Sequence, residues 1–407
     1  MGVEYQPRHP VGAERRRHGH LPLLPHLYAV ICLLCDETHS RKTAFTHLIP
    51  FIRRFIMIPT VSVVMPVYNV EAFVSKAISS VLAQSFTDFE LIIVNDCATD
   101  NSLARCKQFC DSRIRIVQHT VNKGLAAARN TGIRHAIGRY VAFIDSDDLW
   151  HPDKLKLHVD HLQKSPKVGI SFSRSSFIDY RGNPINFYQM PQLTDIDAGH
   201  LLCRNPVGNG SAPVIRRETL NDIRFQALNH SEHYTCYFDE QFRQSEDIEC
   251  WFRIVATTEW QMEGIPEPLT YYRLNHGGLS ANLVKQLASW EQMVTKARRY
   301  APKILLKHEN AARAYQLRYL ARQAIRLGDG RMAKNLVNQA LLTSPQILLK
   351  ETNRTLTTLI AAYLQWLMPR GLYQMCETLG QKYLGYRQRL QIKRDGVTAS
   401  LLTTQLK

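Results

Sequence analysis

Three carboxylates lie within four residues at Asp145-Ser146-Asp147-Asp148. They directly follow the apolar segment 140–144, which predicts a buried strand. Like charges this close repel one another, and burying them is unfavourable unless positive charge neutralises them. Carboxylate oxygens suit a hard divalent cation such as Mg²⁺ or Mn²⁺, which takes its remaining ligands from water and phosphate. The motif therefore indicates a metal-bound phosphate compound, and a solvated acidic turn that caps a helix is the alternative.

A second acidic pair, Glu246-Asp247, opens a helical pattern that continues through Trp251 and Ile254. A carboxylate in this place could act as a general base that takes a proton from a hydroxyl group. Acids in the first turn of a helix are also stabilised by the helix macrodipole without any catalytic role. The pattern alone leaves both interpretations open.

The elements that position these acids follow an alternating pattern between residues 60 and 172. Helical patterns separate five apolar strand patterns, which lie at 61–66, 89–94, 114–117, 140–144 and 168–172. Such repetition predicts an α/β fold with a mostly parallel sheet and helices on both faces. Ligands of these sheets bind beyond the carboxyl ends of the strands. The polar residues that directly follow predicted strands are Tyr68, Asn69, Asn95, Asp96, Asp145 and Asp147.

Length and charge divide the chain of 407 residues, which carries a formal net charge of +16. Residues 281–407 hold 21 Lys and Arg against 6 Asp and Glu, whereas residues 57–280 hold 22 against 25. Residues 1–56 mix Arg, His and Pro without a period, which predicts a disordered N-terminal extension and Met57 as the natural start. The expected domains are therefore this extension, a catalytic region at 57–280 and a basic helical region at 281–407.

The basic region has two open interpretations. Its helical segment 356–368 is apolar and lies beside Lys and Arg, so it could lie in a membrane interface or pack on the catalytic region. Few aromatic residues alternate with the basic ones and no nucleic-acid-reading motif is present, so we expect no nucleic-acid partner. No apolar run reaches membrane-spanning length, and nine scattered cysteines favour a reducing cytoplasm.

The segment 61–161 resembles glycosyltransferases of family 2, which have the GT-A fold. The resemblance rests on four ordered blocks, Val61 to Asn69, Phe89 to Asp96, Asn122 to Asn130 and Asp145 to Asp148. It continues more weakly to about residue 280 and does not include the C-terminal helices. It implies a bacterial enzyme of the hexosyltransferase type that acts in cell-surface polysaccharide biosynthesis. The sugar would pass from a nucleotide-diphosphate donor, with UDP-sugar favoured, to a glycan or lipid-linked acceptor with inversion. A non-catalytic nucleotide-sugar or carbohydrate-binding protein on the same fold is the alternative.

The resemblance also implies roles for individual residues. Asp145 and Asp147 correspond to the DxD motif, which holds Mn²⁺ or Mg²⁺, and His276 is the third candidate ligand. Asp247 corresponds to the catalytic base, and Glu246 is its neighbour. The residues assigned to the donor or its nucleotide are Pro66, Tyr68, Asn69, Asp96, Arg129, Asp145 and Arg273.

Two departures from the family pattern stand out. The block that commonly reads Asp-Asp-Gly-Ser is Asn95-Asp96-Cys97-Ala98 here, so one acid and the glycine of the turn are replaced. The Gln-x-x-Arg-Trp motif of processive family members does not occur in the C-terminal half. We therefore expect an enzyme that adds one sugar at a time, in the cytoplasm or peripherally at the inner face of the plasma membrane.

Overall fold

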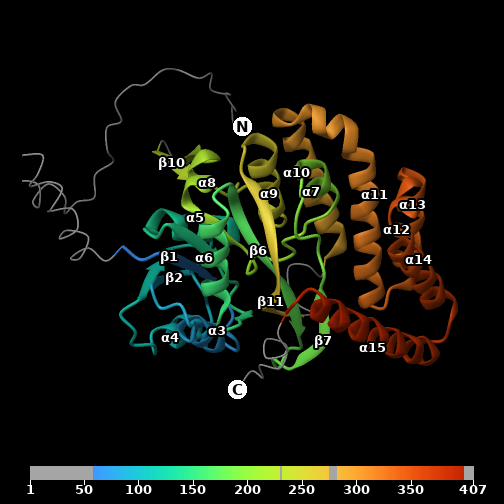
Figure 1. Ribbon diagram of the computed structural model, residues 1–407, viewed down its shortest axis with the longest axis horizontal. Coiled ribbons are helices and arrows are strands. Elements are labelled where there is room, and N and C mark those ends of the chain that lie inside the picture. The colour runs from blue at the N-terminus through green and yellow to red at the C-terminus, as the bar shows by residue number, and fades with distance from the viewer. Residues whose placement is uncertain (1–57, 230–231, 275–281, 398–407) are drawn as a thin grey trace, which may run out of the picture. The chain divides into compact units, whose positions relative to one another are not determined.

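The computed structural model describes residues 58–229, 232–274 and 282–397 (Figure 1). The expectations for residues 1–56, for the start at Met57 and for His276 fall outside these ranges. The chain divides at residue 58 into two units, and residues 59–407 form the second one.

The strands of the described part alternate with helices in its first half, as the sequence predicts. They are β1 (Val61–Val67), β2 (Phe89–Asn95), β3 (Ile114–Gln118), β4 (Tyr140–Phe143), β5 (Leu149–Trp150), β6 (Val168–Ile178), β7 (Pro184–Gln189), β8 (Val214–Arg216), β9 (Phe225–Asn229), β10 (Glu232–Cys236) and β11 (Gln261–Arg273).

Nine of these strands form one sheet in the order β3-β2-β1-β4-β8-β6-β11-β5, with β7 paired to β6. The pairs β3-β2, β2-β1 and β1-β4 are parallel. Every residue of β1 is buried, as is typical of a parallel strand that helices cover on both faces. Strand β8 runs antiparallel to both β4 and β6, so the sheet as a whole is mixed.

The helices of the described part complete the fold. They are α3 (Val74–Leu82), α4 (Ser102–Cys106), α5 (Leu125–His135), α6 (Lys154–Lys164), α7 (Ala198–Cys203), α8 (Arg217–Asp222), α9 (Glu246–Thr257), α10 (Leu283–Tyr300), α11 (Pro302–Arg326), α12 (Gly330–Thr343), α13 (Gln346–Lys350), α14 (Thr352–Leu367) and α15 (Arg370–Arg394).

Helix α5 packs unusually close to β1 because it carries a glycine at the contact. A Cβ atom on Gly132 would lie 2.2 Å from the side chain of Val64. The close approach fixes the position of α5 against the sheet, since no larger residue fits there. Arg129, a predicted donor-site residue, lies one turn earlier on this helix.

The C-terminal helices pack directly on the sheet region. Trp290 and Met293 of α10 share a buried apolar cluster with Phe238 and Trp251. Figure 1 shows α10 to α14 together at one side of the sheet, with α15 turning back toward β7. On α15, the side-chain amide of Gln388 both donates to and accepts from the backbone of Tyr188 in β7, at 3.0 Å each.

Candidate active site

A buried arginine joins two acidic segments that are about 100 residues apart in the chain. Arg129 donates from Nη2 to Asp145 at 2.8 Å and from Nη1 to Glu246 at 2.7 Å. Burial opposes the charge on Arg129, but the carboxylates of Asp145 and Glu246 outweigh it and raise its pKa. The ion pairs therefore hold the end of β4 and the start of α9 against one another.

The acidic turn after β4 carries more negative charge than Arg129 alone compensates. Burial and the neighbouring Asp145 raise the pKa of Asp147 to about 6. The pKa of Asp148 is raised well above its usual value by burial and by both neighbouring aspartates. Carboxylates held this way require additional positive charge when they are ionised. This turn is therefore the part of the site where a cation would be most strongly stabilised.

Asp148 holds the turn in place. Its Oδ2 accepts a hydrogen bond from the hydroxyl of Ser211 at 2.6 Å, and its Oδ1 accepts from the backbone N–H of Arg273 at 2.8 Å. The Ser211 hydroxyl oxygen in turn accepts from the backbone N–H of Asp145 at 2.9 Å. Asp148 thus positions the turn that carries Asp145 and Asp147.

The loop 206–213 presses against Arg129. A Cβ atom on Gly210 would lie 2.1 Å from Nη2 of Arg129 and 2.9 Å from Oδ2 of Asp145. Beneath this loop, Nζ of the fully buried Lys154 donates to the carbonyl of Ala212 at 2.7 Å. Only glycine allows the loop backbone to approach the ion pair this closely.

Glu246 and Asp247 occupy different surroundings although they are adjacent at the start of α9. Glu246 is buried and paired with Arg129, and burial raises its pKa to about 7 although Arg129 opposes the change. Asp247 is half-buried, its Oδ1 accepts from the N–H of Ile248 at 2.8 Å, and burial raises its pKa. Asp247 forms no ion pair among the described residues, although the charge of Arg129 opposes the rise of its pKa.

The residues predicted to bind the nucleotide lie in or near the ends of β1 and β2. Pro66 is buried within β1, and Tyr68 directly after it has 47% of its surface exposed. Asn69 accepts from the backbone N–H of Thr99 at 2.9 Å, which ties the two strand ends together. The exposed ring of Tyr68 is therefore free to stack on a base.

Asp96 organises the loop before α5. Its carboxylate lies 2.6 Å from Nδ1 of His119 and accepts the backbone N–H groups of Lys123 and Gly124 at 2.9 and 2.8 Å. Burial opposes ionisation of Asp96, but these hydrogen bonds prevail and lower its pKa. In the structure Asp96 therefore holds the loop before α5 in place, a role that the family resemblance did not imply.

Arg273 lies against the acidic turn. Its Nε donates to the carbonyl of Asp147 at 2.7 Å, and its Nη1 donates to the carbonyls of Asp179 and Tyr180 at 2.9 and 2.8 Å. These bonds lock the turn to the end of β11. The assigned donor contact of Arg273 remains a prediction, and His276 is not among the described residues.

The sequence patterns predicted no role for Ser211, Gly210 or His119. The signal for the first two was present as Gly208-Asn209-Gly210-Ser211, a cluster of small and polar residues typical of a close backbone approach. Nothing in the spacing of His119 marks it, because its contact with Asp96 arises from the pairing of β2 and β3.

The acidic turn fits a divalent cation by its chemistry. Asp147 offers a carboxylate in a setting that disfavours its uncompensated charge. Within the described ranges, no group of three or more His, Cys, Asp and Glu side chains converges on a metal position. A cation held by Asp147 and Asp145 would therefore take its other ligands from water and phosphate oxygens.

The fold places the acidic turn at the carboxyl end of β4, within the part of the chain whose blocks resemble glycosyltransferases of family 2. The sequence profile described as Glycosyl transferase family 2 matches residues 62–224. The chain is 32% identical over 228 residues to the UDP-Glc:alpha-D-GlcNAc-diphosphoundecaprenol beta-1,3-glucosyltransferase WfgD of Escherichia coli, spanning 56% of this chain and 82% of that protein. It is likewise 32% identical to TuaG of Bacillus subtilis, a glycosyltransferase named for teichuronic acid biosynthesis, over 55% of this chain and 82% of that protein.

The chain belongs to glycosyltransferase family 2 and is an enzyme of that class, which confirms the expectation from its sequence blocks. A solved structure of the mannosyltransferase PcManGT from Pyrobaculum calidifontis, in complex with GDP-Man and Mn²⁺, is similar at 20% identity with a TM-score of 0.48. That similarity spans 75% of this chain and 86% of the mannosyltransferase.

Proposed function

We propose that the protein transfers a sugar from a UDP-sugar to a hydroxyl group of a glycan or lipid-linked acceptor, with a divalent cation and with inversion at the anomeric carbon. One observation carries the proposal. Arg129 is a single buried cation that holds the acidic turn after β4 against the helix start bearing Glu246 and Asp247. A donor-side acid cluster and an acceptor-side acid are thereby fixed relative to one another.

Asp247 is the proposed base. It is half-buried, has a raised pKa and forms no ion pair among the described residues, whereas Glu246 is committed to Arg129. A base with a raised pKa takes a proton more effectively near neutral pH. Direct attack by the acceptor oxygen on the face opposite the leaving diphosphate would invert the anomeric centre.

Asp147 and Asp145 are the proposed ligands of Mn²⁺ or Mg²⁺. When bound, the ion would neutralise the negative charge that develops on the leaving diphosphate. Tyr68 would stack on the base, and Arg129 would keep Asp145 oriented toward the ion.

The relatives support the choice of substrates. WfgD is named for UDP-Glc as donor and for a GlcNAc-diphosphoundecaprenol acceptor, and TuaG is named for teichuronic acid biosynthesis. Each is 32% identical to this chain over 228 residues. We infer the same donor nucleotide and an acceptor of cell-surface polysaccharide biosynthesis.

The assay that tests this function measures nucleotide release from a panel of UDP- and GDP-sugars, with Mn²⁺ and with EDTA. The proposal predicts metal-dependent release of UDP from at least one UDP-sugar, and a product whose anomeric proton coupling in NMR shows inversion. Metal-independent turnover, or a product that retains the donor configuration, would contradict it.

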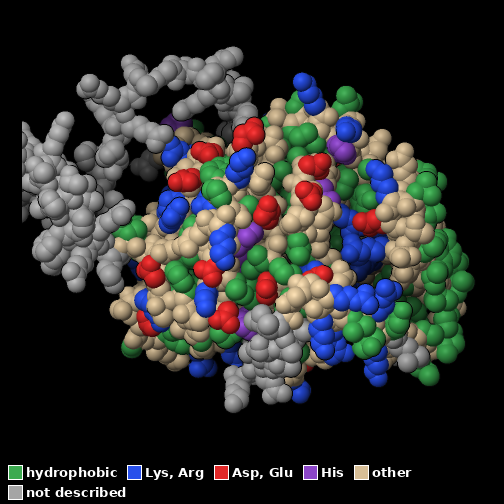
Figure 2. Space-filling model, viewed as in Figure 1, with side chains coloured by type: hydrophobic (Ala, Val, Ile, Leu, Met, Phe, Trp, Pro, Cys, Tyr) green, Lys and Arg blue, Asp and Glu red, His purple; other side chains and the backbone are tan. Residues whose placement is uncertain are grey.

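Peripheral membrane contact is proposed for the last two helices. One face of α14 exposes four apolar side chains, those of Leu356, Ile360, Leu364 and Leu367. Their spacing is that of an amphipathic helix. A second exposed stripe on α15 includes Leu372, Met375, Tyr383, Tyr386 and Leu390. Figure 2 shows hydrophobic side chains gathered along the edge formed by these C-terminal helices. None of the helices in the described part combines the length and apolar character needed to cross a membrane.

Co-sedimentation with vesicles tests the membrane contact. Replacing Ile360 and Leu367 by Gln should reduce binding to phosphatidylglycerol vesicles severalfold, because it removes two of the exposed apolar contacts. Leu306→Gln is the matched control, since Leu306 is 92% exposed on α11, away from both stripes. Equal binding of the double variant and the control would refute the contact.

A further inference from the structure

Five arginines gather where the C-terminal half of α11 and the start of α14 meet the end of α7. We call them the arginine cluster, and its members are Arg204, Arg318, Arg322, Arg326 and Arg354. Their charges lie close enough to act on one another, since Arg318 and Arg354 contribute to lowering the pKa of both Arg204 and Arg322. Figure 2 shows Lys and Arg side chains gathered in a hollow over α11.

The cluster has too few acids to balance its charge. Glu351 is its one carboxylate partner within the described ranges, and it contacts both Arg204 and Arg318. Three members of the cluster, Arg322, Arg326 and Arg354, are exposed and form no ion pair in that part of the chain. Burial, aided by the neighbouring arginines, lowers the pKa of Arg204 to about 9. A bound anion would offset the mutual repulsion of these positive charges, although solvent already screens the exposed ones.

Several of these side chains are held in fixed positions. The guanidinium groups of Arg204 and Arg318 each lie 4.9 Å from the ring centre of Tyr315. Nη1 of Arg318 donates to the hydroxyl of Thr355 at 2.5 Å. Nε of Arg204 is buried and has no hydrogen-bond partner in the described structure. A buried and oriented donor without a partner could donate a hydrogen bond to a bound anion.

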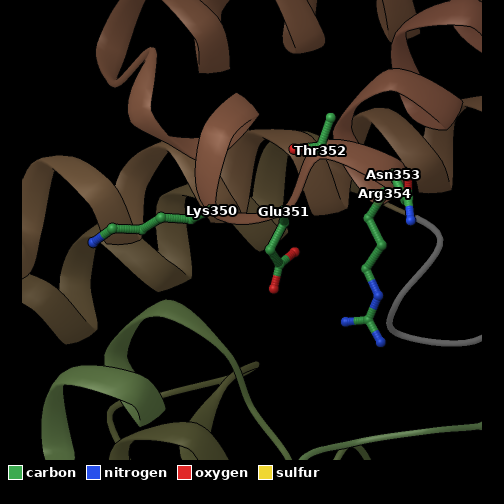
Figure 3. Close-up of a pocket in the computed structure, with 5 residues that line it drawn as sticks. All are labelled: Lys350, Glu351, Thr352, Asn353 and Arg354. Carbon is green, nitrogen blue, oxygen red and sulfur yellow. The ribbon is translucent and has the colours of Figure 1, made fainter.

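A pocket at the junction of α13 and α14 includes Arg354 of the cluster. It has a volume of about 310 Å³ and is lined by Lys350, Glu351, Thr352, Asn353 and Arg354. Figure 3 shows Glu351 and Arg354 pointing to the same side, toward the green ribbon of the catalytic region. Nη2 of Arg354 donates to the carbonyl of Met190 at 3.3 Å, so this side chain crosses to that region.

Aromatic side chains connect the cluster to the active site. The guanidinium of Arg326 lies 6.0 Å from the ring centre of Phe177, and Phe177 lies 6.0 Å from the ring of Tyr272. Burial raises the pKa of Tyr272, and both Asp148 of the acidic turn and Tyr319 of α11 add to the effect. Tyr272 therefore contacts Phe177 and directly precedes Arg273, which binds the acidic turn.

We propose that the arginine cluster binds a phosphate or diphosphate group of the acceptor and so places the acceptor's sugar end toward the acidic site. This inference rests on the proposed function and specifies its acceptor as a phosphate-bearing compound. An arginine guanidinium can donate two parallel hydrogen bonds to two oxygens of one phosphate. Stacking on Tyr315 orients the guanidinium groups of Arg204 and Arg318 for such contacts. The headgroup of an anionic lipid has the same chemistry, so the test must separate the two sources.

The test measures binding of inorganic pyrophosphate to the full chain by calorimetry, in EDTA and without donor. Under these conditions the acidic turn repels the anion, so the arginine cluster is the expected site. Replacing Arg322 and Arg354 by Gln should weaken pyrophosphate binding at least about 10-fold, because two charged hydrogen-bond donors are lost. Replacing both by Lys should recover part of the affinity for pyrophosphate. Lysine restores the positive charge but cannot donate the two parallel hydrogen bonds of a guanidinium group.

Arg299→Gln is the matched control because Arg299 is exposed on α10, outside the cluster. Unchanged pyrophosphate affinity in the Gln double variant would overturn the inference. So would a loss confined to binding of phosphatidylglycerol vesicles, because the cluster would then contact lipid headgroups. Since this assay contains neither donor nor metal, its failure would leave the nucleotide release assay unaffected, and the reverse also holds.

Discussion

At the scale of single residues, the two adjacent acids at the start of α9 have different surroundings. Glu246 is buried against Arg129, whereas Asp247, the proposed base, has no ion-pair partner in the described ranges. We expect Asp247→Asn to lower kcat by about 10²- to 10⁴-fold, the usual contribution of a general base. The KM for the donor should change little, because the amide keeps the size of the side chain.

The pH profile adds a second readout for Asp247. A base works in its ionised form, so kcat/KM should rise with pH through the raised pKa of Asp247. The acidic limb should therefore lie above the usual aspartate value of about 3.9. Glu259→Gln, which removes an exposed acid beyond the end of α9, should leave the profile unchanged. An acidic limb that persists unchanged in Asp247→Asn would show that another group is the base.

Gly210 tests how tightly the loop 206–213 encloses the ion pair. We expect Gly210→Ala to destabilise the protein by about 1–3 kcal/mol, as overpacking of a rigid site does, because the added methyl meets Arg129 and Asp145. It should also weaken binding of UDP with Mn²⁺, since Asp145 is displaced. Gly380→Ala, in open space on α15, is the matched control for thermal melting and calorimetry. Equal melting temperatures for the two variants would contradict the close packing.

At the scale of elements, the turn after β2 carries a strained residue. Cys97 has φ = +59° where the family pattern commonly has glycine. Left-handed backbone is unfavourable for side chains with Cβ and worst for β-branched ones. We expect Cys97→Gly to stabilise the protein by up to about 1 kcal/mol and Cys97→Val to destabilise it by about 1 kcal/mol or more. Urea unfolding measures both, and the opposite ranking would show that the turn changes conformation.

The alternation of strands and helices from β1 to β4 could be predicted because each element there carries a local hydrophobic period. The polar residues at the ends of these strands could be predicted for the same reason. The antiparallel insertion of β8 could not, because its three residues pair with β4 and β6 only in the folded chain. The roles of Ser211 and Gly210 depend on that insertion, since the loop that carries them leads into β8.

At the scale of the whole molecule, α15 is bound to the sheet region by a buried charge. Arg174 of β6 is 3% exposed and donates to Asp395 at 2.5 Å, across 221 residues of sequence. We expect Asp395→Ala to destabilise the protein by about 1–3 kcal/mol. The charged guanidinium of Arg174 would then stay buried without its carboxylate partner. Glu377→Ala is the control, since Glu377 accepts from Gln381 of its own helix. Similar urea midpoints for both variants would show that α15 contributes no stability through this pair.

The positive charge of the C-terminal region could be predicted from the sequence, but the side-chain contacts of that region could not. The excess of Lys and Arg is visible in the residue counts, whereas the arginine cluster forms only because α7, α11 and α14 meet. Residues as far apart as Arg204 and Arg354 have no local pattern that connects them. The division between a catalytic and a helical region at residue 280 remains a prediction.

Calorimetric titration of UDP tests the central claim most directly. The acidic turn should bind the nucleotide diphosphate through a cation, so Mn²⁺ should raise the affinity for UDP at least about 10-fold over EDTA in the unaltered protein. Asp147→Asn should abolish that gain while leaving the metal-free affinity as it was. Equal UDP affinity with Mn²⁺ and with EDTA in the unaltered protein would contradict the account.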